Sequence, residues 1–157
     1  AHNPTISVHI QPYVQRPKQR GPEWVFRKVT RFQVKGMHKI MVVEDDPTLR
    51  ALILEIIQDL NVDTISVSTA DAAFAYLQQH GADIHVIVSD IRTPGRLDGA
   101  DLANQVVTYW PHVQTVLTSG YSADALSKLI QPTMFLPKPW TGDLLLEVVE
   151  KMLARSA

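Results

Sequence analysis

Short apolar runs alternate with amphipathic segments from residue 39 to the end of the 157-residue chain. The runs are rich in Val and Ile, which is typical of strands buried on both faces of a parallel sheet. They cover residues 39–43, 63–68, 84–89, 115–118 and 134–137. The segments between them carry apolar residues at the spacing of a helix with one buried face. The pattern predicts an α/β fold of five βα units, with helices on both faces of the sheet.

Capping residues and turn formers indicate where these helices begin and end. Asp46 is a favourable N-cap before Pro47, which a helix tolerates at its first position. Gly81 is expected to stop the second helix, as glycine commonly does. The helices are predicted to cover residues 47–60, 70–80, 99–110, 123–130 and 141–157. The positions predicted to be buried in the first and last helices are Leu49, Leu52, Ile53, Ile56, Ile57, Leu60, Leu145, Val148, Val149 and Met152.

The N-terminal part of the chain follows neither pattern. Prolines and Gly21 interrupt it, and residues 24–34 fit either a strand or a helix. Residues 1–39 hold eight Lys or Arg and one Glu, a net charge of +7, so the remainder of the chain carries −8. This asymmetry predicts a basic extension over residues 1–36, either a linker or an artificial addition, and one domain over residues 37–157.

Composition excludes several classes of protein. No apolar run reaches the roughly 18 to 20 residues that span a bilayer, and the N-terminus lacks the features of a signal peptide, so a cytoplasmic location is expected. The absence of cysteine excludes disulfides, thiolate catalysis and cysteine-based zinc sites. The six histidines show no metal-ligand spacing. Oxygen ligands are therefore the candidates for holding a metal.

Polar side chains follow four of the five predicted strands. Glu44 and Asp45 come after the first, Asp90 after the third, Ser119 at the end of the fourth and Lys138 after the fifth. The carboxyl ends of parallel strands meet at one edge of a sheet, so these side chains are expected to line one pocket. Clustered carboxylates repel one another unless a cation lies among them, and oxygen ligands suit Mg²⁺. The sequence thus predicts a site for a metal and a phosphate.

Each of these residues also has a simpler structural interpretation. An aspartate such as Asp90 is a common turn former, and Lys138 between two prolines fits a solvated loop charge. Thr118 competes with Ser119 as the functional hydroxyl, and Phe135 fits a core position in a short strand. Only the joint occurrence of these residues, in this order, favours a functional site.

In their order and spacing, these segments resemble the motifs of the two-component response-regulator receiver domain, over residues 37–157. The motifs that carry the resemblance are the acidic pair in 42–47, the aspartate and following proline in 88–94, Asp98-Gly99, the hydroxyl and small residue in 116–121, and the aromatic and lysine in 135–139. The resemblance implies a flavodoxin-like doubly wound sheet of order 2-1-3-4-5. It also implies a domain that accepts a phosphoryl group from a histidine kinase or phosphotransfer protein and then dephosphorylates itself, without being an enzyme in its own right.

The resemblance assigns a role to each residue of the predicted pocket. Asp90 would be the nucleophile that forms an acyl phosphate. Mg²⁺ would be held by Asp45, Asp90, the backbone carbonyl of Arg92 and, through water, Glu44. Lys138 and Ser119 would contact phosphoryl oxygens.

A switch is implied as well. Ser119 and Phe135 would move together on phosphorylation and alter the surface of helix 123–130, strand 134–137 and helix 141–157. A partner, or a second copy in a homodimer, would recognise that surface. The cis peptide of the family is expected at Lys138-Pro139, and Gly120 would leave room for the phosphodonor.

The chain departs from the family pattern in two places, and three other functions are compatible with parts of its sequence. The loop 94–98 is one residue longer than in the commonest receivers, and the bulky Arg92 and Tyr121 flank the expected phosphorylation site. A phosphatase of the haloacid dehalogenase type would carry an aspartate at position 92. A receiver-like module that is never phosphorylated would not need the complete set of polar residues. Nucleic-acid binding by the basic extension would be nonspecific and salt-sensitive, and a solvated linker is favoured over it.

Overall fold

The computed structural model describes residues 39–120 and 123–156. Within them, five parallel strands form one sheet in the order β2-β1-β3-β4-β5, which is the predicted order. The strands are β1 (Lys39–Val43), β2 (Asp63–Val67), β3 (Val86–Asp90), β4 (Gln114–Ser119) and β5 (Met134–Pro137). The predicted structures within residues 1–38 lie outside the described residues.

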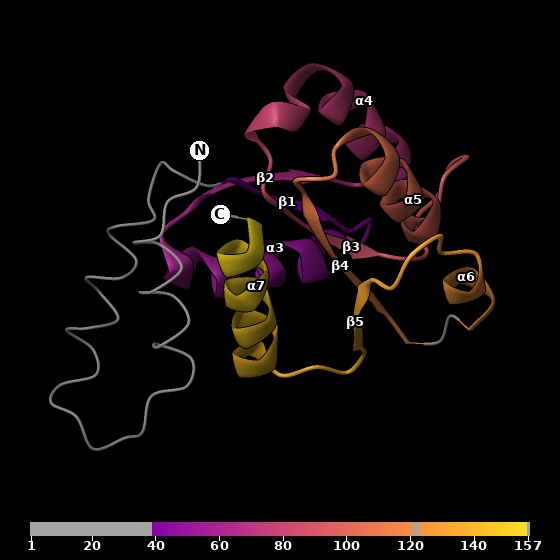
Figure 1. Cartoon of the computed structure of the whole chain (residues 1–157). Coiled ribbons are helices and arrows are strands. Elements are labelled where there is room, and N and C mark those ends of the chain that lie inside the picture. Colours follow the sequence, from indigo (N-terminus) through magenta and orange to yellow (C-terminus); the bar gives the residue numbers. More distant parts are fainter. Residues whose placement is uncertain (1–38, 121–122, 157) are drawn as a thin grey trace, which may run out of the picture.

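Helices cover both faces of the sheet (Figure 1). On one face, α3 (Pro47–Ile57) and α7 (Gly142–Ser156) pack on alternate residues of β1 and β3, such as Val42 and Val88. On the other face, α4 (Ala70–His80) and α5 (Gly99–Tyr109) pack on the intervening residues, such as Met41 and Ile87. This alternation follows from the two-residue period of a strand. Both faces are therefore apolar, as the Val- and Ile-rich runs predicted.

The first helix differs from its prediction on one side. Asp46 caps α3 as expected, accepting hydrogen bonds from the backbone N–H groups of Thr48 at 2.8 Å and Leu49 at 3.2 Å. Ile53 and Ile57 are buried, but the side chain of Leu52 is 46% exposed, so its predicted burial is wrong. The buried face of α3 is therefore narrower than the spacing of its apolar residues predicted. A turn of 3-10 helix, Gln58–Leu60, then buries Leu60.

Gly81 ends α4 at the predicted residue but for a different reason. Its φ of −58° is right-handed, and the chain continues into a 3-10 turn over Gly81–Asp83. A Cβ atom at this position would collide with the indole of Trp110, which lies directly against the glycine. Glycine is therefore required here by close packing between α4 and the end of α5.

The fourth helix is shorter than predicted, and the fifth agrees with its prediction. The helix α6 covers only Ala123–Ser127. Asn104 of α5 accounts for this end, because its side chain donates to the carbonyl of Lys128 at 3.0 Å and accepts from the N–H of Ile130 at 2.9 Å. In α7 the four positions predicted to face inward are all buried, namely Leu145, Val148, Val149 and Met152. Among the described residues no helix is both long and apolar enough to cross a membrane.

Candidate functional site

Three carboxylates meet where β1 and β3 end. These strands are neighbours, with Val43 paired to Ser89, so the residues that follow them emerge side by side. One oxygen from each of Glu44, Asp45 and Asp90 lies within 4.8 Å of the others. Glu44 and Asp90 are buried, whereas Asp45 is exposed. The cluster predicted from the sequence is therefore present, with one open side.

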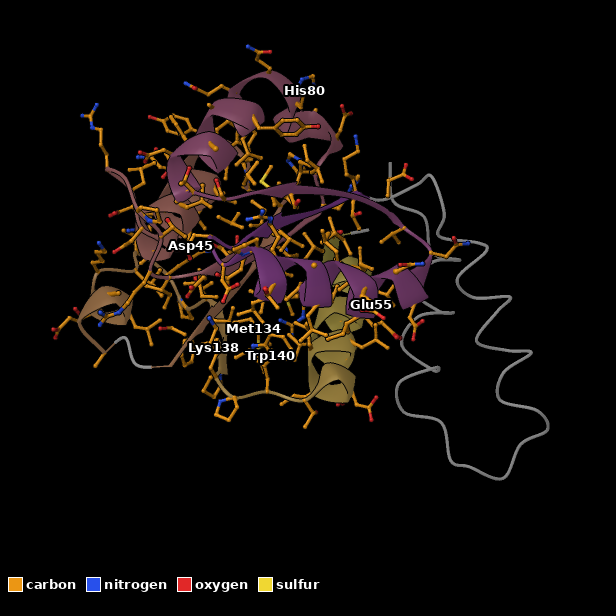
Figure 2. All side chains as sticks on the ribbon, turned by 180° about the vertical axis from the view of Figure 1, so that it is seen from behind. Asp45, Glu55, His80, Met134, Lys138 and Trp140 are labelled. Atoms are coloured by element: carbon orange, nitrogen blue, oxygen red, sulfur yellow. The ribbon has the colours of Figure 1, made fainter. Side chains whose placement is uncertain are left out.

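Lys138 brings a positive charge into this cluster from β5. Its Nζ atom lies 3.4 Å from Glu44 Oε1 and 3.4 Å from Asp90 Oδ2. Its backbone N–H donates to the carbonyl of Ser119 at 3.0 Å, which joins the ends of β4 and β5, and the Lys138-Pro139 peptide is cis. Figure 2 shows Lys138 and Asp45 at the same end of the sheet, where α3 begins. The lysine thus points into the acidic pocket and is not a solvated loop charge.

The pocket holds more negative charge than its own groups neutralise. Burial raises the pKa of Glu44, and the charge of Asp90 adds to this, whereas the backbone N–H of Asp46 and the ammonium of Lys138 lower it. The Asp46 N–H donates to Glu44 Oε2 at 3.1 Å. A bound cation would favour the ionised form. The all-oxygen donor set fits a small, hard divalent ion better than a soft one.

The backbone after Asp90 is held close to the pocket. The N–H of Arg92 donates to Asp90 Oδ1 at 3.4 Å, and the N–H of Gly99 donates to the carbonyl of Ile91 at 2.7 Å. A Cβ atom at Gly99 would collide with the carbonyl of Asp90, so only glycine fits where α5 begins. The neighbouring Asp98 caps α5 in a reciprocal capping box with Asp101. The Asp-Gly pair thereby closes the loop that begins at Asp90.

The two candidate hydroxyls at the end of β4 have different surroundings. Thr118 Oγ1 accepts a hydrogen bond at 3.0 Å from the indole N–H of Trp140, a residue that the sequence analysis did not single out. Ser119, the next residue, is buried at the same end of the sheet as the carboxylates and points to the opposite side of the strand from Thr118. A Cβ atom at Gly120 would meet nothing within 4 Å. The Thr118 hydroxyl is thus engaged by Trp140, and Ser119 stays the predicted phosphoryl-binding hydroxyl.

Phe135 lies in β5, where it pairs with Leu117 of β4. It is partly buried, and it packs with Leu126 and Leu129, at and beyond the end of α6, against a small cluster that includes Leu117 and Ile91. The ring therefore sits between the end of β4 and the short helix. This partly buried position agrees with the interpretation of Phe135 as a core residue and leaves its role in a switch a prediction.

Comparison with known proteins agrees with this geometry. Over 116 residues the chain is 28% identical to the response regulator protein FleR of Pseudomonas aeruginosa, and over 125 residues it is 24% identical to the sensor kinase CckA of Brucella abortus. These alignments cover 72% and 78% of the chain, but only 24% of FleR and 13% of CckA. The chain thus corresponds to a small part of either protein. The alignment with the chemotaxis protein CheY of P. aeruginosa, at 27% identity, covers 74% of the chain and 97% of CheY.

A solved structure of a receiver protein has the same fold. The response regulator receiver protein of Sinorhizobium medicae superposes with a TM-score of 0.69 at 26% sequence identity, covering 76% of this chain and 97% of that one. The family model of the response regulator receiver domain matches residues 40–150. Since this match spans well over half of the chain, the protein belongs to the response regulator receiver family of two-component signalling systems.

Proposed function

We propose that this receiver accepts a phosphoryl group on Asp90 in a Mg²⁺-dependent reaction and so changes the surface that it offers to a partner. The observation that carries the proposal is the position of Asp90, buried among Glu44, Asp45 and the ammonium of Lys138. Phosphoryl transfer needs positioning and charge neutralisation more than covalent chemistry from the protein. This pocket supplies both.

Each residue of the pocket has a separate role in the proposed reaction. A carboxylate oxygen of Asp90 attacks the phosphorus of a phosphohistidine, the P–N bond breaks, and the imidazole nitrogen keeps the electron pair and takes up a proton. Asp45, Asp90 and the carbonyl of Arg92, with Glu44 through water, would hold Mg²⁺, which neutralises charge on the transferred group. Lys138 and Ser119 bind the remaining phosphoryl oxygens. Attack by water later breaks the acyl phosphate and restores the carboxylate.

The switch follows from what Ser119 can reach. A hydrogen bond from its hydroxyl to the phosphoryl group is available only after phosphorylation, so it favours one of two arrangements of the end of β4. Movement of Ser119 toward Asp90 leaves space for Phe135 to turn inward from its place beneath α6. We propose that the surface of α6, β5 and α7 changes as a result, and that a partner or a second copy binds there.

Labelling with a small phosphodonor tests this function. Intact-mass spectra of the protein incubated with acetyl phosphate and Mg²⁺ should show one added phosphoryl group, and none when the metal is chelated. Asp90→Asn should abolish the labelling. Asp46→Asn is the matched control, because the side chain of Asp46 caps α3, asparagine is an equally good cap, and the backbone N–H that contacts Glu44 is retained. Undiminished labelling of Asp90→Asn would show that the acceptor is another residue.

The donor protein would have to cover the open side of this pocket. An apolar hollow of about 460 Å³ shares Lys138 with this pocket and is otherwise lined by Leu49, Leu52, Pro139 and Trp140. The exposed side chain of Leu52 contributes to it. Isolated apolar side chains on a surface are common, but a hollow of them beside a charged pocket is typical of a contact site. We propose that the histidine-bearing domain packs against this hollow.

If this contact exists, a substitution in it should change the rate of transfer from a protein phosphodonor but not from a small one. Leu52→Asp should slow phosphoryl transfer from an autophosphorylated histidine kinase that labels the wild type by about tenfold or more, because it places a charge in an apolar contact. Transfer from acetyl phosphate should be unaffected. Ile130→Asp, at another exposed apolar position, is the matched control. Equal kinase rates for the two variants would exclude Leu52 from the contact.

A further inference from the structure

A carboxylate outside the acidic pocket holds the loop that leads away from Asp90. Asp71 lies in the first turn of α4. Its Oδ2 atom accepts a hydrogen bond from the N–H of Arg96 at 2.8 Å, and its Oδ1 atom accepts one from the N–H of Leu97 at 2.8 Å. These two bonds lower the pKa of Asp71, so the group is ionised at neutral pH. Both oxygens are therefore engaged by one short loop, residues 91–98.

A hydroxyl within the loop makes a second connection to the same helix. Thr93 Oγ1 accepts a hydrogen bond from the N–H of Ala70 at 3.1 Å and donates one to the carbonyl of Leu97 at 3.4 Å. Gly95 has a φ of +113°, and a Cβ atom there would collide with the carboxylate of Asp71. The loop thus follows a path that only glycine allows, and this path brings its N–H groups to Asp71. We call Asp71 and Thr93 together the loop clamp.

The loop clamp acts on the backbone that borders the phosphorylation site. The loop starts at Asp90, and the N–H of Arg92 donates to Asp90 Oδ1. The carbonyl of Arg92 belongs to the same short stretch. A loop with one residue more than usual has more conformations available. Fixing its far half to α4 restricts its near half, where a displacement of about 1 Å has large effects on a reaction.

We propose that Asp71 is a positioning residue for the phosphorylation of Asp90, acting through the loop 91–98 to hold the Arg92 backbone in place for binding the divalent cation. The inference rests on the proposed function. It adds a carboxylate that touches neither the metal nor the phosphoryl group, and it gives the longer loop a purpose in this chain.

Calorimetric titration with MgCl₂ and the rate of labelling by acetyl phosphate test the proposal together. In Asp71→Ala the Kd for Mg²⁺ should rise about tenfold, the usual cost of losing a residue that orients ligands from behind. Labelling at a fixed Mg²⁺ concentration below saturation should slow in proportion. Asp143→Ala is the matched control, because Asp143 is an exposed acid in the first turn of α7. It should leave both quantities unchanged.

The hydroxyl of the loop clamp provides an independent arm of the experiment. Thr93→Val keeps the shape of the side chain and removes its hydrogen bonds, so it should weaken Mg²⁺ binding. Thr93→Ser keeps the hydroxyl and should restore the wild-type Kd. If Asp71→Ala does not fold, the Thr93 pair decides the question in its place.

The outcomes separate the inference from the function on which it rests. A folded Asp71→Ala variant whose Mg²⁺ Kd and labelling rate lie within about twofold of the wild type overturns the positioning role. The same holds if Thr93→Val and Thr93→Ser bind Mg²⁺ equally well. If the wild type itself is not labelled on Asp90, the proposed function fails, and the Mg²⁺ titrations still show whether the loop clamp supports the metal site.

Discussion

At Lys138 and Glu44, the requirements of a stable fold and of a charged pocket oppose each other. Each Lys138 distance to a carboxylate is 3.4 Å, which is long for a hydrogen-bonded ion pair but close enough to offset charge. Glu44 stays in a buried position that raises its pKa. Such an arrangement stabilises the fold less than apolar packing would, which agrees with the proposed binding of a cation and a phosphoryl group.

Replacing Lys138 with alanine should separate metal binding from the response to phosphate. The Kd for Mg²⁺ should be unchanged or up to about fivefold lower, because the variant removes a positive charge that competes with the metal. Binding of beryllofluoride, a phosphoryl mimic, should weaken by about tenfold or more. Calorimetry measures both affinities, and Lys151→Ala, at a half-buried lysine on α7 outside the pocket, is the control. A large loss of Mg²⁺ affinity in a folded Lys138→Ala protein would contradict this role.

Contacts between secondary-structure elements determine features that local sequence does not reveal. Trp110 at the end of α5 requires Gly81 at the end of α4, and Asn104 of α5 binds the backbone that follows α6. Lys128, at the end of α6, pairs with Asp98 at 2.7 Å and Asp101 at 3.1 Å. The short helix α6 is therefore tied to α5 by polar contacts in addition to the apolar cluster that Leu126 joins.

Gly81→Ala should destabilise the protein although alanine favours helices. The added methyl group would force the Trp110 indole to move, and overpacking of this kind costs roughly 1–3 kcal/mol. Gly142→Ala should be close to neutral, because its Cβ would lie 3.5 Å from Ile56 Cδ1, an ordinary contact. Urea unfolding at pH 7 measures both changes. Equal stability of the two variants would mean that the indole can move at little cost.

For the whole molecule, the sequence predicted the fold and the composition of the pocket well. The strand order was predicted correctly, and the strand-end residues Glu44, Asp45, Asp90 and Lys138 lie together as expected. The strand order was implied by the resemblance to receiver domains, whereas the meeting of the strand-end residues follows from the rule that parallel strands share their carboxyl edge. The remaining roles within the pocket stay predictions until labelling tests them.

The sequence could not predict features that depend on contacts between distant segments. Leu52 fits the helical apolar spacing, yet none of the elements that the structure describes covers it. Asp71 looks like an ordinary acid in a first helical turn. Its role depends on a loop 25 residues away. Gly95 and the extra residue of the loop do indicate an unusual backbone path. Neither of them shows that Asp71 is the residue that binds this loop.

The residues that the sequence predicts for the pocket all lie after residue 38, so the basic extension should be dispensable for the reaction. Removal of residues 1–36 should leave Asp90 labelling by acetyl phosphate unchanged, and any effect should fall on the oligomeric state, measured by light scattering. The full chain under the same conditions is the control. A truncated protein that folds but is not labelled would place part of the extension in the active site.

The hydrogen bond from Trp140 to Thr118 gives the chain an optical reporter of its own state. Figure 2 shows Trp140 near Lys138, and its indole N–H is bonded to the residue that precedes Ser119. Indole emission responds to hydrogen bonding and to nearby charge. The chain has two other tryptophans, Trp24 and Trp110. With phenylalanine at both of those positions, the emission spectrum would follow the end of β4 alone, so occupancy of the pocket becomes readable in real time without an attached dye.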